Sequence, residues 1–244
     1  MTLETKMRGF MRNCIFKVNF FAINLRNHGP DRPDAWIRST SLGLKERFDV
    51  DGAIIKMAEE GYEEFGFYGH SLGGAADTNA LGMDSNKLPP NIKVKLVILE
   101  KTFAHSYSFQ VRTHQNLFSN LHLNMKDALP GGAEQFRPYR IMPPSYFQSD
   151  RAVDVAETLA NYNANENDPA NVIGNINAPI LLIFAKGGDS FMTEDDMDDL
   201  AKNARQPYKL PVKSSYTDMG NRHEAELNNL TAFANMLNFC KMYL

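Results

Sequence analysis

The stretch Gly69-His70-Ser71-Leu72-Gly73-Gly74 decides the fold of this chain. It contains the pattern G-x-S-x-G between a short apolar run, residues 65–68, and a run of small residues, 72–81, which predict a strand and a helix. A nucleophile elbow requires this strand–turn–helix context, because its glycines relieve crowding in a sharp turn that exposes the serine hydroxyl. The alternative is an incidental glycine-rich turn. We interpret Ser71 as a nucleophile, with Gly69 and Gly73 relieving the crowding.

A serine hydroxyl is a weak nucleophile, so it needs a general base and an acid that orients the base. Asp189 follows the apolar run 180–185, and His223 follows the last predicted strand, where open parallel sheets place their sites. Ser71, Asp189 and His223 have the chain order of a Ser…Asp…His triad. The backbone N–H of Leu72, at the start of the predicted helix, would serve the oxyanion hole. The simpler alternatives are a turn aspartate and a solvent-exposed histidine at a helix start.

Short apolar runs alternate with helical patterns along the chain. This alternation predicts an α/β fold, with a mostly parallel sheet flanked by helices. The expected strands are residues 18–25, 65–68, 94–99, 180–185 and 210–216. The expected helices are residues 46–60, 72–81, about 193–204 and 224–243. Thr193 is the predicted N-cap of the third helix, because acidic residues fill the turn after it.

Residues 100–177 differ from the rest in being rich in aromatic residues, His, Asn and Pro, without a convincing strand. We predict a helical cap over this range, inserted into a core formed by residues 1–99 and 178–244. The cap's aromatic residues would shape an apolar acyl site or form the cap's own core. They are Phe103, Tyr107, Phe109, Phe118, Tyr146 and Phe147. The spacing of the cap histidines does not suit a metal site, and we expect them at the surface. They are His105, His114 and His122.

Composition argues against several classes of protein. Among the 244 residues, 26 Lys and Arg face 29 Asp and Glu, and this balance gives no reason to expect a nucleic-acid partner. Cys14 and Cys240 are too few for a disulfide framework, and we expect no metal and no cofactor. The longest apolar run, residues 178–185, is far shorter than the roughly 20 residues of a membrane span. With no signal-peptide pattern, the sequence predicts a cytoplasmic protein without an integral membrane segment.

From about residue 18 to the C-terminus, the chain resembles the α/β-hydrolase superfamily. Residues 24–29 (NLRNHG) are similar to its D-x-R-G-H-G turn. Residues 41–50 (SLGLKERFDV) resemble the S-x-G-x-x-E-x-x-D-V stretch of its prolyl-oligopeptidase-like and depalmitoylase-like branches. Residues 179–183 are similar to the strand that precedes the family's aspartate. The resemblance implies a serine hydrolase that cleaves a carboxylic ester or thioester through an acyl-enzyme.

The sequence also departs from the superfamily pattern. The H-G loop that supplies a second oxyanion donor should precede residue 18, together with three strands, and the sequence does not show them there. One of these strands would lie between residues 18–25 and 65–68, and its loss would leave backbone groups on both neighbours unpaired. Asn24 replaces the usual aspartate, and Asn221-Arg222-His223 replaces the usual G-H. Because one lost oxyanion donor costs about 2.7–4 kcal/mol in the transition state, we expect reduced activity.

Two alternatives to an esterase or thioesterase stay open. A catalytically weak or inactive relative could keep the elbow and serve as a binding or interaction module, and the missing strands favour this. A cofactor-free haloperoxidase or lyase could use the same triad, because a fold does not fix a reaction. An open sheet edge would also allow two copies to pair as a homodimer.

Overall fold

The computed structural model describes residues 18–26, 40–113, 163, 166, 168–185, 191–212 and 230–244. Within them, a sheet of four parallel strands has the order β1-β2-β3-β4. The strands are β1 (Glu64–His70), β2 (Lys93–Glu100), β3 (Ile180–Ala185) and β4 (Pro207–Val212). The helices are α2 (Arg47–Glu59), α3 (Leu72–Met83), α6 (Pro169–Val172), α7 (Glu194–Asn203) and α8 (Leu230–Tyr243), with a 3-10 turn η5 (Ile173–Asn175). The predicted α/β fold with a parallel sheet is confirmed.

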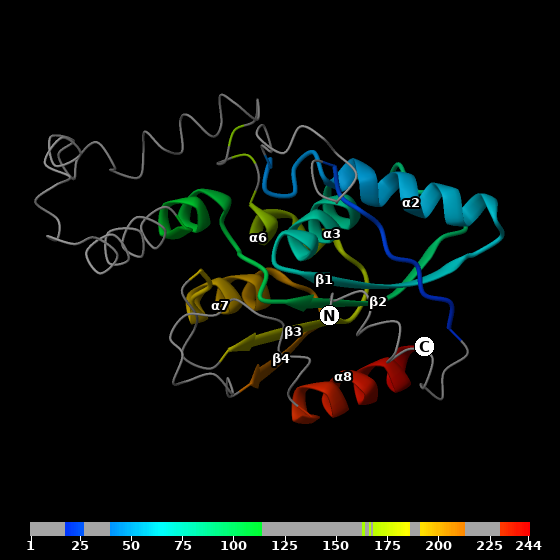
Figure 1. Ribbon diagram of the computed structural model, residues 1–244. Coiled ribbons are helices and arrows are strands. Elements are labelled where there is room, and N and C mark those ends of the chain that lie inside the picture. Colours follow the sequence, from blue (N-terminus) through cyan, green and yellow to red (C-terminus); the bar gives the residue numbers. More distant parts are fainter. Residues whose placement is uncertain are drawn as a thin grey trace, which may run out of the picture.

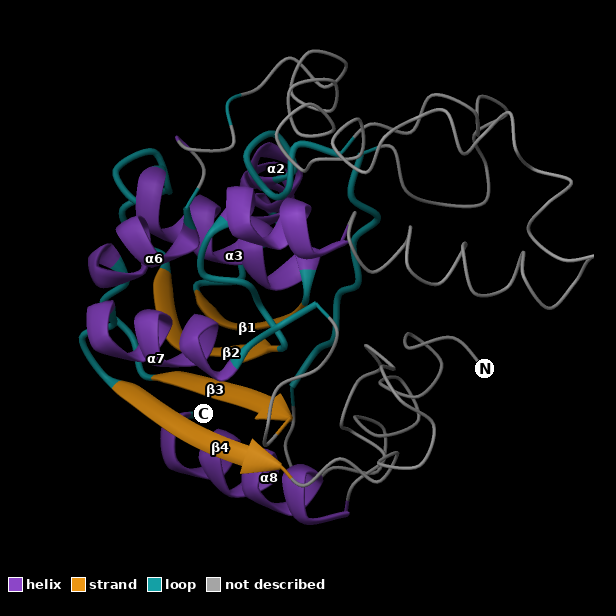
Figure 2. Ribbon diagram, turned by 90° about the vertical axis from the view of Figure 1, so that its left-hand side faces the viewer, coloured by secondary structure: helices purple, strands orange, loops and turns teal. Residues whose placement is uncertain are grey.

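Helices cover both faces of the sheet. Helices α2, α3, α6 and α7 lie on one face and α8 lies on the other (Figures 1 and 2). Neighbouring side chains of a strand point to opposite faces, so Val97 and Leu99 pack under the first layer while Leu96 and Ile98 pack against α8. Both faces of β2 and β3 are therefore buried, which explains why these strands are continuous apolar runs in the sequence.

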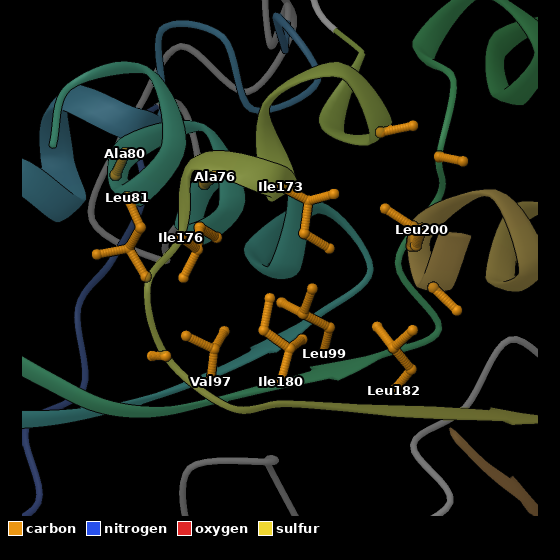
Figure 3. Close-up of a cluster of buried hydrophobic side chains, with 14 of the residues drawn as sticks. Ala76, Ala80, Leu81, Val97, Leu99, Ile173, Ile176, Ile180, Leu182 and Leu200 are labelled. Carbon is orange, nitrogen blue, oxygen red and sulfur yellow. The ribbon is translucent and has the colours of Figure 1, made fainter. Parts of the chain in front are cut away.

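The larger core lies between the sheet and α3, α6, η5 and α7 (Figure 3). The small residues of α3 let it come close to its neighbours: Ala76 and Ala80 are fully buried. A Cβ on Gly82 would lie 2.4 Å from the carbonyl oxygen of Val172, so a larger residue there would push α6 away. The small-residue run therefore fixes α3 directly on the sheet, with its N-terminus at the end of β1.

The predicted strand at residues 18–25 is wrong. The segment is extended, but it pairs with no strand among the described residues, and Phe20 and Phe21 are exposed. Ile23 and Leu25 pack against the larger core while Asn24 is exposed. Residues 23–25 thus alternate between the core and the solvent, as they would in a strand, although the segment forms no hydrogen-bonded ladder. In the described part of the chain, β1 is consequently an edge strand.

The other predicted elements are confirmed with small changes in their bounds. The predicted last strand overlaps β4 only at residues 210–212, and residues 213–216 lie outside the described residues. The predicted last helix contains α8, and its first residues, 224–229, also lie outside them. Thr193 is the N-cap of α7 as predicted, and it forms a capping box with Asp196.

Most of the predicted cap, residues 114–162, lies outside the described residues. Both of its described ends pack into the main core: Phe103 and Ala104 after β2, and Ile173 and Ile176 before β3, have exposed fractions of 2% or less. The two ends of residues 100–177 therefore belong to the main core, and a separate cap between them stays a prediction. None of the helices described here has the length and apolar character needed to cross a lipid bilayer.

Candidate active site

Ser71 occupies a strained turn between β1 and α3. Its backbone angles are φ 53° and ψ −116°, a conformation that residues with a side chain rarely adopt. Such strain costs about 1–3 kcal/mol and persists where the surrounding structure imposes it. Ser71 is the N-cap residue of α3, yet its hydroxyl makes no capping hydrogen bond. A serine at this position normally caps the helix, so here the hydroxyl stays available for other chemistry.

The surrounding structure imposes this turn through β2 and the helix. The N–H of Ser71 donates to the carbonyl of Glu100 at 2.9 Å, and the carbonyl of Ser71 accepts from the N–H of Ala75 at 3.1 Å. The Glu100 carboxylate is fully buried and accepts a hydrogen bond from the Tyr68 hydroxyl. Burial and the neighbouring carboxylate raise the pKa of Tyr68, so the phenol stays protonated and keeps donating. The strand side of the elbow is thereby bonded to Glu100 of β2, and its helix side is bonded to Ala75 of α3.

Gly69 and Gly74 relieve the crowding in this turn, so the prediction for Gly73 is wrong. A Cβ on Gly69 would lie 2.4 Å from the Gly74 backbone, and a Cβ on Gly74 would lie 1.9 Å from the Thr102 hydroxyl oxygen. Gly73 has no atom within 4 Å of such a Cβ, because it points into open space. Gly73, the second glycine of the G-x-S-x-G pattern, is therefore not required by the packing. Gly74, the glycine that follows it, is required.

The stretch that resembles a family motif, residues 41–50, supports the elbow. The buried Glu46 carboxylate accepts hydrogen bonds from the Ser41 N–H at 3.0 Å, the Ser41 hydroxyl at 2.5 Å and the Gly43 N–H at 2.9 Å. Gly43 has φ +95°, and a Cβ there would lie 2.8 Å from the backbone of Ala75. The closed loop therefore lies against the first turn of α3. Asp49 of the same stretch pairs with Arg26 at 2.9 Å, which ties the extended segment to α2.

An apolar cluster lies beside the first turn of α3. Its fully buried members are Leu42, Ala75, Phe103 and Met192, and the half-buried Phe109 stacks on Phe103 with ring centroids 4.5 Å apart. These residues come from five different loops and helices. Of the predicted cap aromatics, Phe103 is thus a core residue, and residues 118, 146 and 147 lie outside the described residues.

The carboxyl ends of the four parallel strands lie at one edge of the sheet. Ser71 follows β1 directly, and the chain after β3 and after β4 leaves the same carboxyl edge. Asp189, in the segment after β3, and His223, in the segment after β4, lie outside the described residues. Neighbouring strands are about 4.8 Å apart, so β3 is about 10 Å from β1 at this edge. The Leu72 N–H, predicted for the oxyanion hole, belongs to the first residue of α3.

The sequence analysis did not single out Asp77, and it did not predict the partners of His105. Asp77 on α3 is buried against Gly69, and burial raises its pKa to about 7. His105, expected at the surface, is about one-third exposed and contacts Asp168 at 2.9 Å and Asp199 at 3.1 Å. These partners lie 63 and 94 residues away in the sequence, so no local pattern indicates them. Within the described ranges, no three His, Cys, Asp or Glu side chains converge as metal ligands.

No family model and no curated protein matches the chain. Several solved structures are similar to it. Est816, an N-acyl homoserine lactone degrading enzyme, has a TM-score of 0.52 at 15% identity, over 88% of this chain and 80% of its own. The esterase PF2001 of Pyrococcus furiosus has a TM-score of 0.51 at 12% identity, over 84% of this chain and 64% of its own. VinJ has a TM-score of 0.50 at 9% identity, over 82% of this chain and 72% of its own. At such identities the likeness shows the fold alone.

Proposed function

We propose that this chain, which has the α/β-hydrolase fold, is a serine hydrolase that cleaves a carboxylic ester or thioester. The strained Ser71 turn between β1 and α3 carries the proposal. A backbone strain of this kind is retained where it serves a site. It presents a hydroxyl beside the N-terminus of a helix, where a negative charge is stabilised.

In the proposed reaction, the Ser71 hydroxyl oxygen attacks the acyl carbon, and His223 takes its proton as general base. Asp189 orients the histidine and stabilises its charged form. The negative charge that develops on the acyl oxygen faces the Leu72 N–H. When the tetrahedral intermediate collapses, His223 returns the proton to the leaving alcohol or thiol. Water then repeats the sequence on the acyl-serine and releases the carboxylic acid.

Esters and thioesters fit this site better than amides. Their leaving groups depart more readily, so the barrier depends less on the oxyanion hole. The proposal assigns one oxyanion donor among the described residues, the N–H of Leu72, which is the first residue of α3. The apolar cluster of Leu42, Ala75, Phe103, Met192 and Phe109 beside the elbow favours an acyl group with apolar surface.

Hydrolysis of a panel of p-nitrophenyl esters and acyl thioesters tests this function. We expect turnover in the wild type and none above the buffer rate in Ser71→Ala, because removing a triad nucleophile costs on the order of 10⁶ in rate. His223→Asn and Asp189→Asn should also lose activity. Ser85→Ala, at an exposed serine away from the elbow, is the matched control and should keep it.

A binding module is the second candidate, and one observation favours it. β1 is an edge strand within the described residues, so the sheet beside the elbow is less complete than the resemblance implies. A folded wild type that hydrolyses no ester or thioester of the panel, and whose Ser71→Ala variant behaves identically, would support this candidate and contradict the hydrolase.

A further inference from the structure

Two side chains join the end of β2 to β1 beside the elbow. The hydroxyl of Tyr68, on β1, donates to the carboxylate of Glu100, the last residue of β2. The backbone carbonyl of Glu100 in turn accepts from the N–H of Ser71 at 2.9 Å. The backbone from Ser71 back to Tyr68 completes a closed ring of contacts. The proposed nucleophile is therefore one member of a ring that also contains two side chains outside the triad.

Two backbone irregularities border this ring. The register of β1 against β2 shifts between Phe65 and Gly66, so the pairing at the start of the strands does not set the pairing at their ends. Directly after Glu100 the chain leaves the strand, because Lys101 has φ 49°, a strained value for a residue with a side chain. The Tyr68–Glu100 bond joins the two strands between these points.

The ring is buried, so its polar groups depend on one another. Glu100 is fully buried, and Ile183, its register partner on β3, belongs to the apolar cluster that packs against α8. Tyr68 packs against the same cluster. A carboxylate in such surroundings is costly unless donors hold it, and a hydrogen bond to a charged group is about twice as strong as a neutral one. The Tyr68 hydroxyl therefore restrains the position of Glu100.

We propose that Tyr68 and Glu100 are positioning residues for Ser71: their bond fixes the Glu100 carbonyl, which holds the N–H of Ser71 and so sets the place of its hydroxyl. This rests on the proposed function. The Ser71 backbone is strained, with φ 53°, and a strained turn relaxes when a contact that imposes it is lost. A misplacement of a reacting group by about 1 Å costs about 100-fold in rate.

The test is the kinetics with which a fluorophosphonate probe labels Ser71 in the full chain, measured as the maximal rate and the half-saturating probe concentration. Tyr68→Phe removes only the hydroxyl. We expect it to lower the maximal rate about 10- to 100-fold at an unchanged half-saturating concentration, because the attacking oxygen is displaced while the contacts that bind the probe are not. Glu100→Asp keeps the charge on a shorter side chain that does not close the ring, and it should lower the rate in the same way.

Glu100→Gln separates the hydrogen bond from the charge. Its amide oxygen still accepts from the Tyr68 hydroxyl, so the maximal rate should stay within about threefold of the wild type. Tyr208→Phe is the matched control. It makes the same change at a phenol on β4, at the far edge of the sheet, whose hydroxyl contacts that of Tyr243 at 2.5 Å. Both of its kinetic values should equal those of the wild type. Urea unfolding gives the folded fraction of each variant, and the rates are corrected by it.

Three results would overturn the proposal. The first is a folded Tyr68→Phe with wild-type kinetics; if that variant does not fold, wild-type kinetics of Glu100→Asp decide. The second is a Glu100→Gln variant as slow as Tyr68→Phe, which would assign the effect to the charge and not to the ring. Both leave the proposed function in place, because the wild type is labelled. The third is a folded wild type that is not labelled at Ser71, which would overturn the proposed function as well.

Discussion

At the scale of single residues, the strain at Ser71 is a measurable property. A side chain at a positive φ costs about 1–2 kcal/mol, and glycine avoids this cost. We therefore predict that Ser71→Gly is more stable than Ser71→Ala by about 1 kcal/mol in urea unfolding, although both variants lack the nucleophile. Equal stabilities of the two variants would show that the turn is not strained.

Gly73 and Gly74 form a matched pair of adjacent glycines on α3. Gly74→Ala would bring a methyl group to 1.9 Å from the Thr102 hydroxyl oxygen, whereas Gly73→Ala meets nothing within 4 Å. Overpacking of this kind destabilises by about 1–3 kcal/mol or more, whereas alanine in an open helical position stabilises by up to about 1 kcal/mol. Thermal unfolding of both variants should show opposite signs. A destabilised Gly73→Ala beside a tolerant Gly74→Ala would contradict the described packing.

Asp77 predicts a dependence of stability on pH. Its pKa in the folded protein is about 7, above the ordinary value of 3.8, so the folded state binds the proton more tightly than the unfolded state does. The contribution of Asp77 to stability is therefore greatest below about pH 4 and falls as the pH rises to about 7, by as much as about 4 kcal/mol for three pKa units. Asp77→Asn should remove this fall. Parallel urea-unfolding profiles for both proteins over that range would show that burial does not raise the pKa.

At the scale of elements, His105 predicts how pH affects the contact between the helical residues 106–113 and α7. Burial lowers the pKa of His105, but the hydrogen bonds to Asp168 and Asp199 raise it on balance. The charged histidine thus contributes stability that is complete below its ordinary pKa of about 6.5 and is lost as the pH rises through the raised value. His105→Asn should be less stable than the wild type near pH 5.5, with a smaller difference near pH 8.5.

Urea unfolding of His105→Asn at the two pH values checks this prediction, and Asp199→Asn supplies the control. Removing one carboxylate lowers the pKa of His105, so the loss of stability should begin at lower pH than in the wild type. If the difference between His105→Asn and the wild type does not change with pH, the histidine is not held as a cation between the two carboxylates.

Local sequence patterns predicted two kinds of element: those that are stabilised by neighbouring residues and those that are buried on all sides. Residues 180–185 are a strand with the predicted bounds, and a short continuous apolar run is typical of a strand that is buried on both faces. Thr193 was identifiable because a capping box is formed by neighbouring residues. The extended segment 18–25 has a strand's composition, but a strand also needs a hydrogen-bonded neighbour, and a single sequence does not reveal whether one is present.

In the candidate site too, features encoded by neighbouring residues were predicted, and features that depend on distant residues were not. The turn at Ser71 is encoded within a few residues, so its position and its place before α3 are confirmed. The choice between Gly73 and Gly74 depends on Thr102, which approaches from the end of β2 and is not part of the local pattern. The contact between His105 and Asp199 joins residues 94 apart, and no local pattern indicates it. The roles of Asp189 and His223 stay predictions.

At the scale of the whole molecule, the four strands of the parallel sheet, which has helices on both faces, all run in the same direction (Figures 1 and 2). The elbow, the loop of residues 41–46 and the apolar cluster all meet at the carboxyl end of the strands. β1 is the outer strand there in the described part of the chain, and pairing of two copies along it stays a prediction.

Intact-mass analysis after treatment with a fluorophosphonate, on the wild type and Ser71→Ala side by side, tests the central claim most directly. The probe reacts with activated serines and demands little substrate specificity. The account predicts one adduct on the wild type and none on Ser71→Ala. A folded wild type that takes up no adduct, or an adduct that persists in Ser71→Ala, would contradict the claim that Ser71 is an activated nucleophile.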